Sequence, residues 1–109
     1  MIQSLTPLQA RELISKGEVD VVDVREAAEW ATGHIAGARL VPLELLRTMP
    51  KATLKASPVL FVCAAGVRSQ TAARLASQVG IETIFSLSGG TRAWVKAGLE
   101  LVHPVNIAV

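Results

Sequence analysis

PVLFVCAAGVRS, residues 58–69, is the stretch of sequence that most clearly predicts the fold. Its apolar part, residues 59–62, is rich in β-branched side chains, which is typical of a strand buried on both faces in a parallel sheet. Cys63 follows this run, and the small residues 64–66 come next. From Arg68 onward, apolar residues recur at helical spacing until a glycine. The stretch therefore predicts a strand, a short loop and a helix, with a thiol at the carboxyl end of the strand.

Cys63 is the only cysteine of the chain, and its expected position favours reactivity. Ligands of open α/β sheets bind outside the carboxyl ends of the strands. A tight loop that leads into a helix can direct several backbone N–H groups towards one anion. The helix N-terminus and Arg68 both favour the thiolate, which is the nucleophilic form of cysteine. A lone cysteine is more often an inert buried side chain, but this loop and Arg68 favour a nucleophile.

Strands and helices alternate along the rest of the chain. The patterns predict strands near residues 2–5, 19–24, 39–41 and 82–87, and helices near 7–16, 27–31, 42–49, 68–79 and 91–97. A surface loop is expected at 51–57. This order predicts an α/β fold with a mainly parallel sheet and helices on both faces. A length of 109 residues is enough for one domain with a real core, which we expect to span 1–109.

Composition argues against several classes of function. Half of the residues are hydrophobic, yet no apolar run is long enough to cross a bilayer, and the N-terminus lacks signal-peptide features. One cysteine cannot form an internal disulfide, so the expected compartment is the cytoplasm. A net charge of +2, with cations scattered singly, does not favour a nucleic-acid partner. The histidines and carboxylates show no metal-ligand spacing, so neither a metal nor a cofactor is expected.

Three stretches of the sequence resemble the signatures of the rhodanese-like (sulfurtransferase) domains. Residues 63–69, CAAGVRS, resemble the active-site loop of that family. Residues 22–38, from VDVRE to GHIAGA, resemble its first signature, and residues 87–98, which begin LSGG, resemble its C-terminal signature. The three stretches lie in the family's order and at about its spacing. The resemblance implies five strands, with the active loop after the central one.

The resemblance also implies a reaction. Cys63 would take a sulfane sulfur from thiosulfate or a related anionic donor, form a persulfide, and pass the sulfur to a thiol or to cyanide. This is covalent catalysis in two displacements. The backbone N–H groups of the loop would stabilise the charge on the terminal sulfur, and Arg68 would hold the anionic donor. The substrate-binding residues expected from this reaction are Ala64, Ala65, Gly66, Val67 and Arg68.

Four further residues are expected to support the site: Asp23, Arg25, His34 and Ser69. Asp23 and Arg25 follow a buried strand and are expected to form an ion pair at the floor of the pocket. His34 comes after a glycine in a turn, where a histidine more often fixes the loop through a backbone hydrogen bond than acts as a general base. Glu29 is expected to pair with an arginine, which at a surface contributes about 0–1 kcal/mol.

Two other classes of function stay open. A tyrosine-phosphatase-type site also surrounds an anion with a cysteine and an arginine, but five residues separate them there. Here four residues, 64–67, intervene, and no aspartate general acid is obvious. The other alternative is a regulatory or sulfur-relay module with a protein as sulfur donor or acceptor. Cys63 argues against an inactive module, but the sequence does not separate a relay from an enzyme that uses small molecules.

Overall fold

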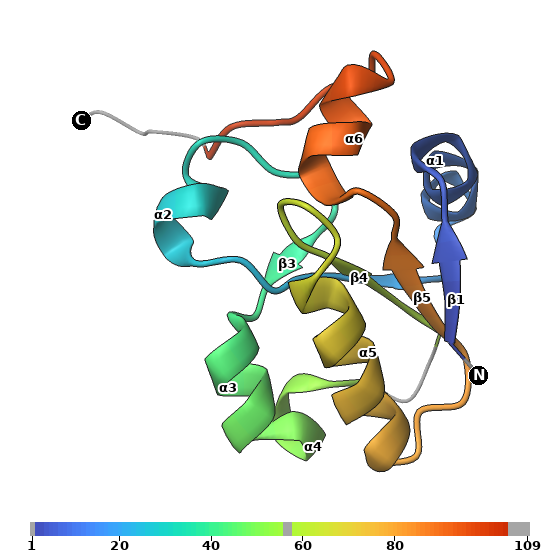
Figure 1. Ribbon diagram of the computed structural model, residues 1–109, viewed down its shortest axis with the longest axis vertical. Helices are drawn as coiled ribbons and strands as arrows, with labels where there is room; N and C mark the ends of the chain where they lie inside the picture. The colour runs from blue at the N-terminus through green and yellow to red at the C-terminus, as the bar shows by residue number, and fades with distance from the viewer. Residues whose placement is uncertain (1, 56–57, 105–109) are drawn as a thin grey trace.

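The computed structural model describes residues 2–55 and 58–104, which form a five-stranded sheet between two layers of helices (Figure 1). The strand order is β1-β5-β4-β2-β3, and every neighbouring pair is parallel. The strands are β1 (Ile2–Leu5), β2 (Asp20–Asp23), β3 (Arg39–Leu40), β4 (Val59–Val62) and β5 (Ile84–Leu87). The helices are α1 (Pro7–Ser15), α2 (Ala27–Trp30), α3 (Leu43–Thr48), α4 (Pro50–Thr53), α5 (Arg68–Gln78) and α6 (Gly90–Lys96). None of these helices is long and apolar enough to cross a membrane.

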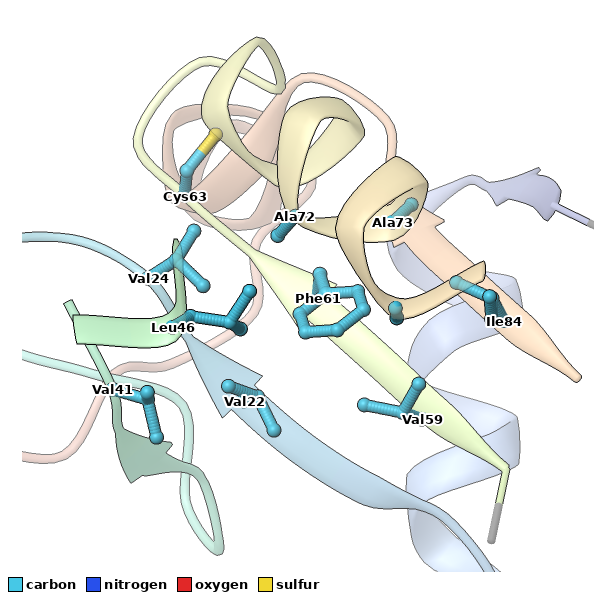
Figure 2. Close-up of a cluster of buried hydrophobic side chains, with 11 residues drawn as sticks. Val22, Val24, Val41, Leu46, Val59, Phe61, Cys63, Ala72, Ala73 and Ile84 are labelled. Atoms are coloured by element: carbon cyan, nitrogen blue, oxygen red, sulfur yellow. The ribbon is translucent and has the colours of Figure 1, made fainter. Parts of the chain in front are cut away.

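Strand β4 is the centre of the sheet, and all four of its side chains are buried. Val59 and Phe61 face α3 and α5, where Phe61 packs in a cluster with small side chains of α5 (Figure 2). Leu60 and Val62 face α1 and α6, and Trp94 of α6 anchors the cluster on that side. The prediction of a strand buried on both faces in a parallel sheet is therefore confirmed.

The region after β3 differs from the sequence prediction. One helix was expected to end at Pro50 and to lead into a loop, but α3 ends at Thr48 and Pro50 begins the short helix α4. Proline lacks a backbone N–H, but the first turn of a helix needs none of its N–H groups for internal bonds. Pro50 therefore starts a helix here as well as preventing continuation of the previous one. Residues 56–57 of the expected loop lie outside the described residues.

The segment after α6 packs along the edge of the molecule. Leu99 and Leu101 contact the cluster around α1 and α6, and the indole N–H of Trp94 donates to the carbonyl of Glu100 at 2.9 Å. Val102 forms an antiparallel bridge with His34. No function was assigned to this tail from the sequence, and residues 105–109 lie outside the described residues.

The turn between β5 and α6 packs directly against the loop that follows β4. The N–H of Thr91 donates to the carbonyl of Cys63 at 2.8 Å, and the N–H of Arg92 donates to that of Ala64 at 3.1 Å. Gly90 has φ +63°, and a Cβ there would overlap the Cys63 carbonyl oxygen and lie 2.5 Å from the Ala64 carbonyl carbon. Only glycine allows the β5–α6 turn to lie this close to the backbone of Cys63 and Ala64, and the resulting hydrogen bonds hold the active loop in place.

We expect Gly90→Ala to destabilise the protein more than Gly17→Ala. Gly17 has a similar φ of +70°, but nothing lies within 4 Å of a Cβ built there. Gly17→Ala should therefore cost only the left-handed backbone penalty of about 1–2 kcal/mol. Gly90→Ala should add about 1–3 kcal/mol, because rigid backbone must move to admit the methyl group. Urea unfolding of the two variants measures the difference, and equal losses would contradict the close approach.

Candidate active site

The sulfur of Cys63 lies inside the loop that joins β4 to α5. Backbone N–H groups of Gly66 and Ser69 donate to this sulfur at N···S distances of 3.0 and 3.3 Å. Figure 2 shows Cys63 at the end of β4, beyond Phe61 in the same cluster. The side chain is only 1% exposed. Cys63 thus combines the burial of a small core residue with hydrogen-bond donors that stabilise an anionic sulfur.

The sulfur also takes the place of a side-chain cap at the start of α5. The residue that precedes this helix, Val67, has no side chain that can accept from the first-turn N–H groups. Such N–H groups have no partner within a helix and carry partial positive charge. Because the N–H of Ser69 donates to Cys63 instead, the helix end contributes to the stabilisation of negative charge at the sulfur.

Gly66 gives the loop its curvature. Its φ is +94°, and a Cβ at this position would lie 2.9 Å from the backbone nitrogen of Gly89. A larger residue would therefore push the loop away from the β5–α6 turn and move the Gly66 N–H away from the sulfur. Ala65 and Val67, on either side, are exposed and form the rim of the loop.

Ser86, which the sequence analysis did not single out, extends the hydrogen bonds at Cys63 through the expected supporting residue Ser69. Ser69 is buried, and its hydroxyl lies 3.6 Å from the Cys63 sulfur and 2.8 Å from the hydroxyl of Ser86. Ser86 is buried in β5, two residues after the buried Ile84. A hydroxyl at an inward-facing position of a strand is the sequence signal that could have indicated it, because a buried polar group needs a partner.

Asp23 and Arg25 form the expected ion pair. The pair is buried, with the two side chains 0% and 4% exposed, and the Arg25 guanidinium donates to both carboxylate oxygens at 2.9–3.1 Å. The remaining donors of Arg25 reach the carbonyl of Gly33 at 2.8 Å and that of Glu29 at 3.3 Å. The pair therefore ties α2 and the following turn to the carboxyl end of β2, as a scaffold next to the active loop.

Arg68 forms a bidentate ion pair with Glu29. Its two terminal nitrogens donate to the two oxygens of the carboxylate at 2.7 and 2.8 Å. These hydrogen bonds, together with one from the N–H of Glu26 at 3.0 Å, lower the pKa of Glu29 to about 2. The same pairing raises the pKa of Arg68. Both partners are therefore charged at neutral pH. Arg68, which was expected to bind the anionic sulfur donor, already binds the carboxylate of Glu29.

His34 lies in the turn after α2 and is fixed by its backbone. Its N–H donates to the carbonyl of Val102, and its carbonyl accepts from the N–H of Val102, both at 2.8 Å. The imidazole stacks on the indole of Trp30 with ring centroids 3.5 Å apart. The hydrogen bonds described for Cys63 do not include His34. This geometry agrees with the expected loop-fixing contact.

A small cavity opens beside the loop. It has a volume of about 210 Å³ and is lined by Val24, Glu26, Leu43, Glu44 and Arg68. Val24 follows β2 and donates its N–H to the carbonyl of Val62, so this cavity lies next to the end of the central strand. Across residues 2–55 and 58–104 no three histidine, cysteine or carboxylate side chains are grouped to hold a metal ion.

Comparison with known proteins agrees with this geometry. The model of the rhodanese-like domain family matches residues 6–97. The chain is 36% identical over 92 residues to thiosulfate sulfurtransferase GlpE of Pseudomonas aeruginosa, which covers 84% of this chain and 83% of the relative. It is 31% identical over 108 residues to thiosulfate sulfurtransferase GlpE of Coxiella burnetii, which covers 99% and 96%.

Solved structures show the same architecture. A rhodanese-related protein from Thermoplasma volcanium superposes with a TM-score of 0.84 at 30% identity, over 94% of this chain and 99% of that one. A protein from Rhodopseudomonas palustris described as a possible tyrosine phosphatase also superposes at 0.84, with 28% identity over 93% and 85%. The fold, the loop around Cys63 and the match over most of the sequence lead to one assignment: this chain belongs to the rhodanese-like domain family.

Proposed function

We propose that this protein is a sulfurtransferase of the rhodanese type, and that Cys63 carries the transferred sulfur. The observation that carries the proposal is the position of the Cys63 sulfur, which accepts hydrogen bonds from the backbone N–H groups of Gly66 in the loop and Ser69 in the first turn of α5. The two GlpE relatives are named thiosulfate sulfurtransferases, which supports this class of reaction.

The reaction is a double displacement at sulfur. The Cys63 thiolate attacks the outer sulfur of thiosulfate, the S–S bond of the donor breaks, and sulfite leaves with the bonding electrons. A persulfide remains on Cys63. An acceptor thiolate, or cyanide, then attacks the outer sulfur, and the Cys63 thiolate leaves. No external oxidant or reductant enters the cycle.

The loop would stabilise the persulfide through its backbone. The outer sulfur carries negative charge, and we expect it to accept hydrogen bonds from N–H groups between Ala64 and Arg68. The hydroxyl of Ser69, which is itself hydrogen-bonded to Ser86, would be the side-chain partner of the Cys63 sulfur inside the protein. Asp23 and Arg25 would act as scaffold, because their donors and acceptors are already paired with each other and with α2.

Two alternatives are less well supported. The possible phosphatase from R. palustris shares the fold, but four residues between Cys63 and Arg68 make a smaller loop than the five of tyrosine-phosphatase-type sites. A sulfur relay between proteins uses the same persulfide and differs only in its donor and acceptor. We place the small-molecule donor first because the two relatives are named thiosulfate sulfurtransferases.

Mass spectrometry after treatment with thiosulfate tests the proposal. The protein should gain one sulfur atom that a thiol reductant removes, and Cys63→Ser should gain none, because no other cysteine is present. Thiosulfate:cyanide transfer should be abolished in Cys63→Ser while the circular dichroism spectrum stays unchanged. Substantial activity in a folded Cys63→Ser protein would contradict a persulfide mechanism.

Arg68→Ala should reduce the use of thiosulfate on the order of tenfold, because the substitution leaves the carboxylate of Glu29 without its neutralising partner beside a dianionic donor. Arg68→Lys should recover only part of the activity, because lysine lacks the planar fork that Glu29 binds. Steady-state kinetics measure both, with Arg74→Ala on the same helix as control. Full activity of Arg68→Lys would mean that only charge matters.

Ala65→Lys should lower the KM for thiosulfate. Ala65 is exposed on the rim of the loop, so a lysine there adds a cation for a dianionic donor without filling the core. The effect should shrink as ionic strength rises, because an exposed charge is screened. Ala65→Gln controls for side-chain size. A thiosulfate KM that is unchanged in Ala65→Lys at low salt would show that the apolar rim does not govern donor binding.

A further inference from the structure

The guanidinium of Arg68 is the only side-chain cation on the loop from Cys63 to Ser69. It also lines the cavity beside that loop, so it is the group best placed to attract an anionic substrate. Both of its terminal nitrogens, however, donate to Glu29 at 2.7 and 2.8 Å. Arg68 and Glu29 are 34% and 36% exposed, so the pair lies where substrate and solvent can reach it.

Glu29 is held in place for this contact from two directions. One carboxylate oxygen also accepts the N–H of Glu26 at 3.0 Å, which fixes the rotamer at the start of α2. The backbone carbonyl of Glu29 accepts from Arg25, whose guanidinium is anchored on the buried Asp23. An ordinary surface ion pair loses side-chain entropy when it forms. Here that loss is reduced, because the fold already positions the carboxylate.

The charges around the cavity add to the effect of Glu29. Glu26 and Glu44 line the cavity with Arg68, and Glu44 pairs with the exposed Arg47 at 3.1 Å. The remaining lining residues, Val24 and Leu43, are apolar. The cavity beside the active loop therefore presents an arginine that Glu29 already neutralises, the carboxylate of Glu26, and a second ion pair formed by Glu44 and Arg47.

We propose that Glu29 is a specificity-determining residue. By occupying both terminal nitrogens of Arg68, it withholds that cation from anionic substrates, so thiosulfate and other anionic sulfur carriers bind more weakly than they would beside an unpaired arginine, whereas uncharged carriers are unaffected. This inference rests on the proposed sulfur transfer and goes beyond it, because it names the charge class of the substrates. Glu29 acts through Arg68 and does not itself touch the transferred sulfur.

Glu29→Gln tests the proposal, because glutamine keeps the size of the side chain and one acceptor for Arg68 while it removes the charge. The KM for thiosulfate should fall about fivefold to tenfold at low ionic strength, with kcat within about twofold, and the gain should shrink in salt. Glu12→Gln on α1, across the sheet, removes the same charge from an exposed position and should leave the KM unchanged. The gain from Glu29→Gln should also be smaller in an Arg68→Ala background.

The acceptor step gives a second readout. The persulfide on Cys63 is formed first, and its transfer to 3-mercaptopropionate and to 2-mercaptoethanol is then followed in single-turnover reactions. Taking the ratio of the two rates removes any effect of the substitution on the persulfide itself, because that effect is the same for both thiols. Glu29→Gln should raise the mercaptopropionate:mercaptoethanol ratio several-fold over that of the parent, because only the first acceptor carries a carboxylate tail.

Thiosulfate binding to Cys63→Ser proteins separates this inference from the proposed function, because no transfer can occur in them. Calorimetry should give a lower Kd for Cys63→Ser/Glu29→Gln than for Cys63→Ser, whether or not the parent forms a persulfide. A Kd and a KM that are unchanged or raised by Glu29→Gln would overturn the inference. So would a gain that is equally large without Arg68, since the effect would then not act through the arginine.

Discussion

The hydrogen bonds from backbone N–H groups to the sulfur of Cys63 depend on a loop that is held in a strongly curved path. Gly66 can adopt this path because it has no Cβ to meet the backbone of Gly89. The carbonyls of Cys63 and Ala64 are in turn held by N–H groups at the start of α6. Burial alone would make Cys63 an inert core residue. The curved loop instead gives it donors that an anionic sulfur requires.

Two ion pairs, Asp23–Arg25 and Glu29–Arg68, determine the charge presented next to this loop. The buried pair of Asp23 and Arg25 fixes α2 at the end of β2, and α2 carries Glu29 to Arg68. The arginine that would attract an anion is thus part of a structural contact before any substrate arrives. Asp23 and Arg25 therefore also influence substrate selectivity, because by positioning α2 they determine how much positive charge Arg68 presents at the cavity beside the loop.

The fold and the position of Cys63 could be predicted from the sequence, because they depend on local patterns. The apolar run before Cys63 and the helical spacing after Arg68 are enough to place the thiol at the carboxyl end of a buried strand. The contacts of Ser86 and Glu29 join segments far apart in the chain, so the sequence indicates that each needs a polar partner but does not identify Ser69 or Arg68 as that partner. Pro50 misled the prediction because a proline that ends one helix can begin the next.

The central claim is that the loop N–H groups hold a sulfur anion on Cys63. The crystal structure of the protein after reaction with thiosulfate tests it most directly. We expect a second sulfur bonded to Cys63, within hydrogen-bond distance of N–H groups in residues 64–68, with the loop path unchanged. A persulfide that points away from these N–H groups, or that forms only after the loop opens, would contradict the account.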